Sequence, residues 1–268
     1  MIAGRVDRRI LFGIFFMCGT GLLFPVMGGL AKILGSDYSS LQVSWARAFG
    51  HIVFMLIFFV PKFGLRMLRT RRLGTQMARS ALLFASNATH FYAITFIPIA
   101  KAASISLMAP LVVVPFAWAI LGERTTVGRM MALLVLASAT TYALYQVLTR
   151  MISAIDSPET SAIYSSIVGS FGMLLVLPFV WTTPHNPRDV FYFCCLGVLG
   201  GIGHYFVARA LTYAPANIVS PFQYMQLIGS VVVGYLFFGD FPDVLGWVGA
   251  AIIVGAGLYI GLAQSRRS

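Results

Sequence analysis

Long apolar stretches recur along the whole chain, and each is about as long as a helix that crosses a lipid bilayer. Such a helix needs about 20 mainly apolar residues. Between its charged residues the sequence contains nine stretches of this kind: 10–31, 40–61, 80–98, 102–122, 127–149, 161–181, 190–214, 216–239 and 244–263. The sequence therefore predicts an all-α integral membrane protein with about nine hydrophobic helices.

Composition agrees with a membrane protein. Of the 268 residues, 59% are hydrophobic and only 10% are charged, whereas soluble domains carry about one quarter charged residues. A water-soluble single domain is therefore excluded. The net charge of +11 indicates basic loops held against anionic lipid, so the partner we expect is the bilayer and not nucleic acid.

The sequence lacks the residue patterns of a zinc site, a disulfide framework or a nucleotide-binding loop. Cys18, Cys194 and Cys195 lie inside apolar stretches, without the Cys or His spacing of a zinc site. No Walker A pattern is present, so hydrolysis of ATP by this chain is not expected. We therefore expect no metal and no cofactor.

Basic residues cluster near the start of the chain and in its longest polar connection. The first apolar stretch, 10–31, is longer than the roughly 7–15 apolar residues of a secretory signal, so we interpret it as a retained span. By the positive-inside rule the basic segments lie in the cytoplasm. The simplest interpretation of these charges is that they orient the protein and have no binding role. They are Arg5, Arg8, Arg9, Lys62, Arg66, Arg69, Arg71, Arg72 and Arg79.

Two pairs of landmarks indicate an internal duplication. Pro98 follows a short Ala-Ile-Thr-Phe-Ile run, and Pro215 follows the similar Ala-Leu-Thr-Tyr-Ala. Glu123 and Asp240 each follow a glycine further along. Both pairs are separated by the same shift of 117 residues. Because transporters are often built by duplication, the shared register favours two repeats over coincidence.

These residues resemble the EamA branch of the drug/metabolite transporter superfamily, and the resemblance covers nearly the whole chain. It implies ten helices in two inverted five-helix repeats that move small organic metabolites across a cell inner membrane. We expect the first repeat at 1–131, with four spans and a truncated fifth, and the second at 132–268, with five. The motifs that carry the resemblance are Leu41 to Arg47, Pro98 to Ala102, Ala109-Pro110, Leu121 to Arg124, Ala210 to Ala216, Ser220-Pro221 and Phe238 to Pro242.

The nine stretches depart from the ten helices of that pattern. An odd number of crossings would put Arg150, Arg266 and Arg267 outside, whereas an even number would return them to the cytoplasm. The charges favour an even number. Either one span has been lost or one segment does not cross fully, and the sequence leaves both open.

Polar side chains inside spans are costly, so each is a candidate for substrate binding. Several of them share a helix face through a spacing of three or four residues. No residue is a candidate for catalysis. The candidates for substrate binding are Arg47, His51, Asn87, His90, Tyr142, Gln146, His204, Arg209, Gln223, Tyr224 and Gln226.

Two arginines among these amides and hydroxyls suit an anionic or zwitterionic substrate, because a guanidinium pairs with a carboxylate in a planar fork. Both Arg47 and Arg209 also lie near enough to a helix end to extend toward the membrane surface, and that alternative stays open. All eight acidic residues fall in loops or at helix ends. Coupling through a carboxylate is therefore disfavoured, which leaves exchange, facilitated diffusion or a cycle based on His51, His90 or His204.

We predict a secondary transporter of amino-acid-, vitamin- or nucleoside-like metabolites that works by alternating access. The alternative is a lipid flippase, or a non-transporting subunit that needs a partner. An integral-membrane enzyme is disfavoured, because the only cluster of His with an acid, 185–189, lies in a short Pro-containing loop. Besides a small-molecule substrate and the bilayer, a homodimer is left open. Substrate identity and direction of transport are not determined by the sequence.

Overall fold

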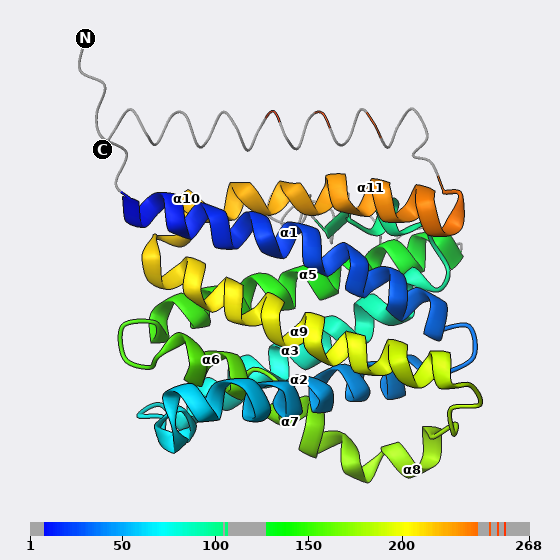
Figure 1. Ribbon diagram of the computed structural model, residues 1–268. Coiled ribbons are helices and arrows are strands. Elements are labelled where there is room, and N and C mark those ends of the chain that lie inside the picture. Colours follow the sequence, from blue (N-terminus) through cyan, green and yellow to red (C-terminus); the bar gives the residue numbers. More distant parts are fainter. Residues whose placement is uncertain are drawn as a thin grey trace.

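A bundle of long helices makes up the protein, and the helices lie side by side along a common direction (Figure 1). The computed structural model describes residues 8–103, 105–106, 127–240, 247, 251 and 255. Within these residues every regular element is a helix. Four of the described helical stretches are long and apolar enough to cross a membrane: Arg8–Leu34 (α1), Ser40–Phe63 (α2), Pro187–Tyr213 (α9) and Pro221–Phe238. The prediction of an all-α membrane protein is confirmed.

The first two long helices match their predicted stretches closely. The side chain of Ser39 accepts a hydrogen bond from the backbone N–H of Leu41 and caps the start of α2. At the other end of α2, Gly64 adopts φ 68°, a backbone conformation that glycine tolerates and most residues avoid. The chain then turns into the short 3-10 helix Leu65–Leu68 (η1).

The third helix, Leu73–Ile94 (α3), is offset from its predicted stretch. It begins seven residues earlier than 80–98, because the basic residues before Ser80 continue the helix and do not form a loop. It ends four residues earlier, since the residue before Pro98 is disfavoured in a helix. Arg79, which we had counted among the loop charges, is therefore a residue of α3.

Helix α3 packs antiparallel against Val127–Ile152 (α5). Near one end of the pair, the Arg79 Nε donates to Thr149 Oγ1 at 2.8 Å, and toward the other end Ser86 Oγ donates to the Ser138 carbonyl at 2.8 Å. The last turn of α5, with Arg150, therefore lies at the end of the bundle where α3 begins. A count of nine crossings in strict alternation would put Arg150 at the opposite end, whereas the even count that the charges favour agrees with its position here.

One predicted helix is broken. The stretch 161–181 forms Pro158–Tyr164 (α6), Ile167–Phe171 (α7), the 3-10 helix Gly172–Leu175 (η2) and Leu177–Val180 (α8). Serine side chains interrupt its first half: Ser165 Oγ donates to the Ala162 carbonyl at 2.5 Å, and Ser166 Oγ bonds to another helix. Such bonds compete with the backbone ladder and bend helices. Pro178 is the second residue of α8, where its missing N–H ends the hydrogen bonding of the preceding turn.

The stretch 216–239 is also divided, into Ala216–Val219 (α10), the 3-10 helix Ser220–Tyr224 (η3) and Met225–Phe238 (α11). Pro221 at the start of η3 explains the break. The stretches 102–122 and 244–263 fall mostly outside the described residues, of which 99–103, 105–106, 247, 251 and 255 are helical. The total number of crossings therefore stays a prediction.

The two ends of the bundle differ in charge. We call the end that carries the start of α1, η1 and the end of α9 the basic end, and the opposite one the far end (Figure 1). The positive-inside rule predicts that the basic end faces the cytoplasm. Cations at the basic end include Arg8, Arg9, Lys62, Arg66, Arg69, Arg71, Arg72 and Arg150, whereas Lys32 and Arg188 lie at the far end.

Candidate functional site

Polar side chains from five parts of the chain meet in the middle of the bundle. Each lies on a helix that is otherwise apolar, so its partners come from neighbouring helices. Helix α9 packs against both α1 and α2 and brings its own histidine to this point. We define the central polar cluster as Arg47, His51, Tyr142, Tyr145, Gln146, Ser166, His204 and Gln223.

Two histidines stack at the centre of this cluster. The rings of His51 on α2 and His204 on α9 are parallel, with centroids 5.9 Å apart, and both side chains are buried. Each ring has a partner at Nδ1: Ser166 Oγ lies 2.7 Å from that of His51, and Tyr145 Oη lies 3.4 Å from that of His204. In both rings Nε2 is buried without a partner among the described residues.

Arg47 lies one helical turn before His51 and is 1% exposed. Its guanidinium does not reach toward the membrane surface. It packs across the helix contact against Gly200, where an added Cβ would lie 3.3 Å from Arg47 Nη1. Arg47 Nε and Nη1 have no hydrogen-bond partner in the described part of the chain. A buried guanidinium in this state is costly and leaves donors available to a ligand.

Helix α5 and η3 supply the remaining polar groups. The rings of Tyr142 and Tyr145 stack with centroids 5.5 Å apart. Gln146 Nε2 donates to Gln223 Oε1 at 3.2 Å, and thereby links α5 to η3. Six of the nine buried side-chain N and O atoms without a partner among the described residues belong to the central polar cluster. Because such atoms are rare in native proteins, their concentration here marks a place where a ligand would complete the hydrogen bonds.

The structure brings together six of the candidates derived from the sequence and separates the others. Asn87 Nδ2 donates to the Leu83 carbonyl of its own helix at 2.7 Å. His90 is half-buried beside Phe91, nearer the far end of α3. Arg209 lies toward the basic end, where its Nη2 donates to Tyr213 Oη at 3.0 Å.

Tyr224 and Gln226 are half-buried at the junction of η3 and α11. There the backbone of α11 approaches α1 closely, since a Cβ on Gly21 would lie 2.9 Å from the Gln226 N. The substrate-binding role of every candidate stays a prediction.

Three residues of this region were not identified as candidates from the sequence: Tyr145, Ser166 and Arg79. Arg79 is fully buried, and its guanidinium lies 4.8 Å from the centroid of the Tyr145 ring. Its Nη1 and Nη2 both donate to the Ser161 carbonyl at 3.2 Å. Arg79, Leu83 and Asn87 follow one another at intervals of four residues, which puts them on one face of the helix. This periodicity could have identified Arg79 as a buried residue.

At the basic end, a buried carboxylate joins the two halves of the chain. Asp156, between α5 and α6, accepts hydrogen bonds from the Thr70 hydroxyl, from the Arg71 N–H at 3.3 Å and from Gln76 Nε2 at 3.0 Å. Gln76 in turn accepts a hydrogen bond from Arg79. The network therefore runs from the loops of the basic end to Tyr145 in the central polar cluster.

At the far end, Lys32 in the last turn of α1 holds two other segments. Its Nζ lies 3.2 Å from Asp240 Oδ2 after α11, and donates to the Ile97 carbonyl after α3 at 3.3 Å. The same ammonium lies 4.8 Å from the ring centroid of Phe238. These contacts close α1, α3 and α11 against one another.

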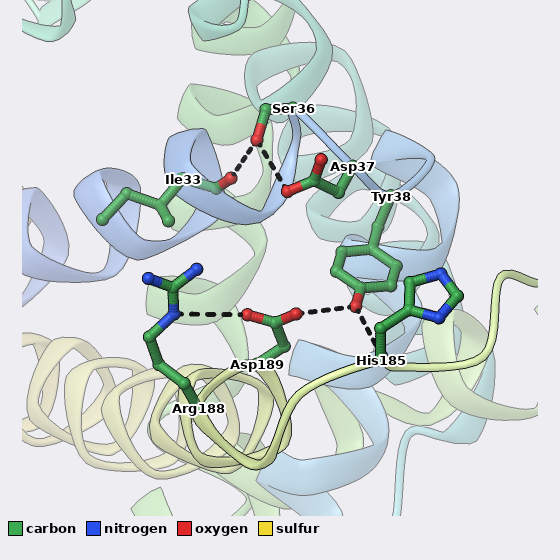
Figure 2. A network of polar contacts seen from close by, with 7 residues as sticks. All are labelled: Ile33, Ser36, Asp37, Tyr38, His185, Arg188 and Asp189. Carbon is green, nitrogen blue, oxygen red and sulfur yellow. Dashed lines mark hydrogen bonds and ion pairs between the residues drawn. The ribbon is translucent and has the colours of Figure 1, made fainter.

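A second network at the far end connects the α1–α2 loop to the start of α9 (Figure 2). Tyr38 Oη donates to Asp189 Oδ2 at 2.9 Å and accepts from the His185 N–H at 3.3 Å. Arg188 lies 3.6 Å from the other oxygen of Asp189. Burial, together with the adjacent Asp189 carboxylate, raises the pKa of Tyr38, so its hydroxyl stays a donor to more alkaline pH than that of a free tyrosine.

A helical bundle with a buried polar centre and basic loops at one end defines a class, that of multi-span membrane transport proteins. The chain belongs to the EamA-like transporter family, because a model of this family matches residues 11–135 and again 129–262. This confirms the resemblance derived from the motifs and the presence of two repeats.

Curated relatives include transporters named for two different substrates. An S-adenosylmethionine uptake transporter of Rickettsia prowazekii is 27% identical, over 86% of this chain and 86% of its own. A riboflavin transporter of Vibrio cholerae is 25% identical, over 98% of this chain and 97% of its own. One solved crystal structure has a TM-score of 0.65 at 16% identity, over 97% of this chain and 99% of that one, and shows a similar fold.

The two family matches begin in helices that run in opposite directions. The first begins in α1, which starts at the basic end, and the second in α5, which finishes there. Lys32 near the end of α1 donates to the Ile97 carbonyl at the far end, whereas Arg150 near the end of α5 donates to the Leu211 carbonyl at 2.5 Å at the basic end. Corresponding helices of the two repeats are thus inverted, as the resemblance implied.

Proposed function

We propose that the protein is a secondary transporter of the cell inner membrane that binds a small organic metabolite in the central polar cluster. The observation that carries this proposal is that Arg47 Nε and Nη1 and the Nε2 atoms of His51 and His204 are buried and have no partner among the residues that the structure describes. The described acids bond elsewhere: Asp37 to Ser36, Glu159 to Tyr205, and Asp156, Asp189 and Asp240 within the networks described above. An anionic group of a substrate would complete the site.

The chemistry of the cluster favours a substrate with a carboxylate and a flat ring. Arg47 presents a planar fork of donors that matches a carboxylate. The rings of Tyr142, Tyr145 and His204 offer aromatic faces for stacking. Of the two compounds for which the relatives are named, S-adenosylmethionine carries a carboxylate and riboflavin does not. We therefore rank amino-acid-like substrates, and nucleoside-like substrates that carry a carboxylate, above uncharged vitamins.

Alternating access is the mechanism that the contacts at the two ends support. The far end is closed by Lys32 with Asp240, and the basic end by Asp156 with Arg71 and Gln76. Each set joins elements of different repeats. For a substrate to enter and leave, one set must break while the other is kept, as in other carriers built from inverted repeats.

Uptake by the purified protein in liposomes tests this proposal. S-adenosylmethionine, riboflavin and a panel of amino acids and nucleosides serve as substrates. Arg47→Gln should abolish uptake of any transported carboxylate, whereas Arg72→Gln, the same change at an exposed position, should leave it unchanged. Uptake that is insensitive to Arg47→Gln would overturn the assignment of the site. A folded protein that takes up none of the panel would favour a flippase or a subunit that needs a partner.

A further inference from the structure

The segment that connects α2 to α3 is a firmly anchored part of the basic end. Met67 in η1 is 3% exposed and packs into a cluster with Met55 and Ile163. The carbonyl of Leu68 accepts a hydrogen bond from Tyr164 Oη at 2.9 Å. The Thr70 hydroxyl bonds to Asp156. The side chains on the outer side of this segment are therefore presented from a fixed backbone.

Three cations surround a hollow on this segment. Lys62, Arg66 and Arg69 line it together with Gly64, whose left-handed backbone makes the turn between α2 and η1. Within the described part of the chain, none of the three side chains has a hydrogen bond or an ion pair. Asp156, the acid that contacts the segment, already accepts hydrogen bonds from Thr70, Gln76 and the Arg71 N–H. The hollow is therefore strongly positive.

Apolar side chains flank the same hollow. Leu65 is 67% exposed and Phe63 is 44% exposed. Phe63 is the last residue of α2, a helix apolar enough to cross the membrane, and Leu65 lies just beyond it, so both lie where that helix would leave the bilayer. At this depth they would contact acyl chains while the cations meet the headgroups.

We propose that Lys62, Arg66 and Arg69 bind the phosphate of an anionic phospholipid in the cytoplasmic leaflet, with Leu65 and Phe63 against its acyl chains. The guanidinium groups of Arg66 and Arg69 each offer paired donors to phosphate oxygens. The adjacent apolar residues select a lipid over free phosphate. This site is separate from the central polar cluster and does not depend on the transported substrate.

If these cations served only to orient the protein, any two of them in the loop should be equivalent, because the positive-inside rule counts charges in a loop without regard to their exact positions. The chain offers a matched control for this. Arg71 and Arg72 lie in the same connection and are exposed, but they do not line the hollow. The double variants Arg66→Gln with Arg69→Gln and Arg71→Gln with Arg72→Gln therefore lose equal charge from the same loop.

Lipid retention by the full chain tests the proposal. The protein is loaded with dioleoylphosphatidylglycerol or dioleoylphosphatidylcholine and examined by native mass spectrometry and by thermal unfolding. The wild type should retain phosphatidylglycerol preferentially and unfold at a higher temperature with it. Each basic residue that contacts the headgroup contributes roughly fivefold in affinity, so the Arg66/Arg69 variant should bind about 25-fold more weakly. The Arg71/Arg72 variant should retain the lipid as the wild type does.

Three results would overturn the site: equal losses in both double variants, equal retention of the two lipids, or stabilisation by inorganic phosphate as strong as that by phosphatidylglycerol. Unfolding in phosphatidylcholine and protease accessibility verify that each variant is folded and correctly oriented. If the glutamine variant does not fold, Arg66→Lys with Arg69→Lys replaces it. This pair keeps the charge and removes the paired donors, so its retention should be intermediate.

Discussion

A Cβ atom on Gly197 would lie 2.5 Å from the Cα of Gly50, so α2 and α9 cross with only main chain between them. Small residues permit such close helix contacts in membranes. Arg47 lies one turn before Gly50, and Gly200 lies one turn after Gly197. The crossing therefore fixes the guanidinium of Arg47 against α9, between elements of the two repeats.

Gly197→Ala should destabilise the protein and reduce uptake. The added methyl group meets backbone atoms of α2, which cannot move aside as a side chain could. Such overpacking costs about 1–3 kcal/mol. Gly28→Ala in α1 is the matched control, because nothing lies within 4 Å of its added Cβ. Thermal unfolding of both variants in the same detergent provides the comparison, and equal midpoints would contradict the close crossing.

Arg47→Met should raise stability while it removes transport. Two nitrogens of the buried guanidinium have no partner in the described part of the chain, so an apolar side chain of similar length removes an uncompensated charge. Replacing buried ionic groups by apolar ones can stabilise a protein by about 1–4 kcal/mol. Thermal unfolding and liposome uptake are measured on the same preparation. A lower unfolding midpoint would mean that Arg47 holds the fold together and is not kept for binding.

Arg79→Met should have the opposite effect on stability. This arginine is equally buried, but its donors are used by Thr149, Gln76 and the Ser161 carbonyl. Hydrogen bonds to a charged group contribute about 1.5–3 kcal/mol, and the loss of Arg79 removes the donor to Thr149 Oγ1 and to Gln76 Oε1, whereas the Ser161 carbonyl keeps the N–H of Ser165. We expect a lower unfolding midpoint and increased protease cleavage at the basic end. An unchanged midpoint would show that this network does not hold the repeats together.

Loss of the ion pair between Lys32 and Asp240 should open the far end more often. The test places a cysteine at Ser44, which is fully buried one turn before Arg47, in a background without the native cysteines. A partly exposed ion pair contributes about 1 kcal/mol or less, so Asp240→Asn should speed labelling by an impermeant maleimide up to about fivefold. Exchanging the two charges, Lys32→Asp with Asp240→Lys, should slow labelling again. Labelling that is fast in every variant would contradict the closure.

Tyr38→Phe should weaken the far end in a manner that depends on pH. The pKa of Tyr38 is raised in the folded protein by burial and by Asp189, so the hydroxyl is a donor at neutral pH. For a group whose pKa rises on folding, the stabilisation is complete below the unfolded pKa of about 10 and declines as the pH passes through the higher folded value. The wild type should therefore unfold at a higher temperature than Tyr38→Phe at pH 7–9, and the difference between the two unfolding temperatures should shrink at more alkaline pH. A difference that is constant with pH would exclude the hydroxyl as its source.

Much of the fold follows from the length of the apolar stretches, whereas its breaks do not. Helices α1, α2, α5 and α9 are each one uninterrupted apolar run, and their lengths were predicted closely. The broken segment from α6 to α8 has a similar composition, but its serine side chains bond to the backbone and to His51, which hydropathy does not register.

For the candidate site, helical spacing correctly places Arg47 and His51 on one buried face of α2. Arg79 was missed because charge counting assigned it to a loop. Tyr145 was missed because tyrosine is common in membrane helices, and only the fold places its hydroxyl beside His204. Which polar faces meet depends on how the helices are arranged, and that information is not contained in any single stretch.

The opposite placement of Lys32 and Arg150 has a thermodynamic consequence. Each is a cation near the end of the first helix of its repeat, and each donates to a carbonyl group near the end of another helix, one at either side of the membrane. For a carrier that works by the alternating access proposed above, contacts of the same kind at both ends predict two conformations that differ little in free energy, so that neither side is strongly preferred at rest.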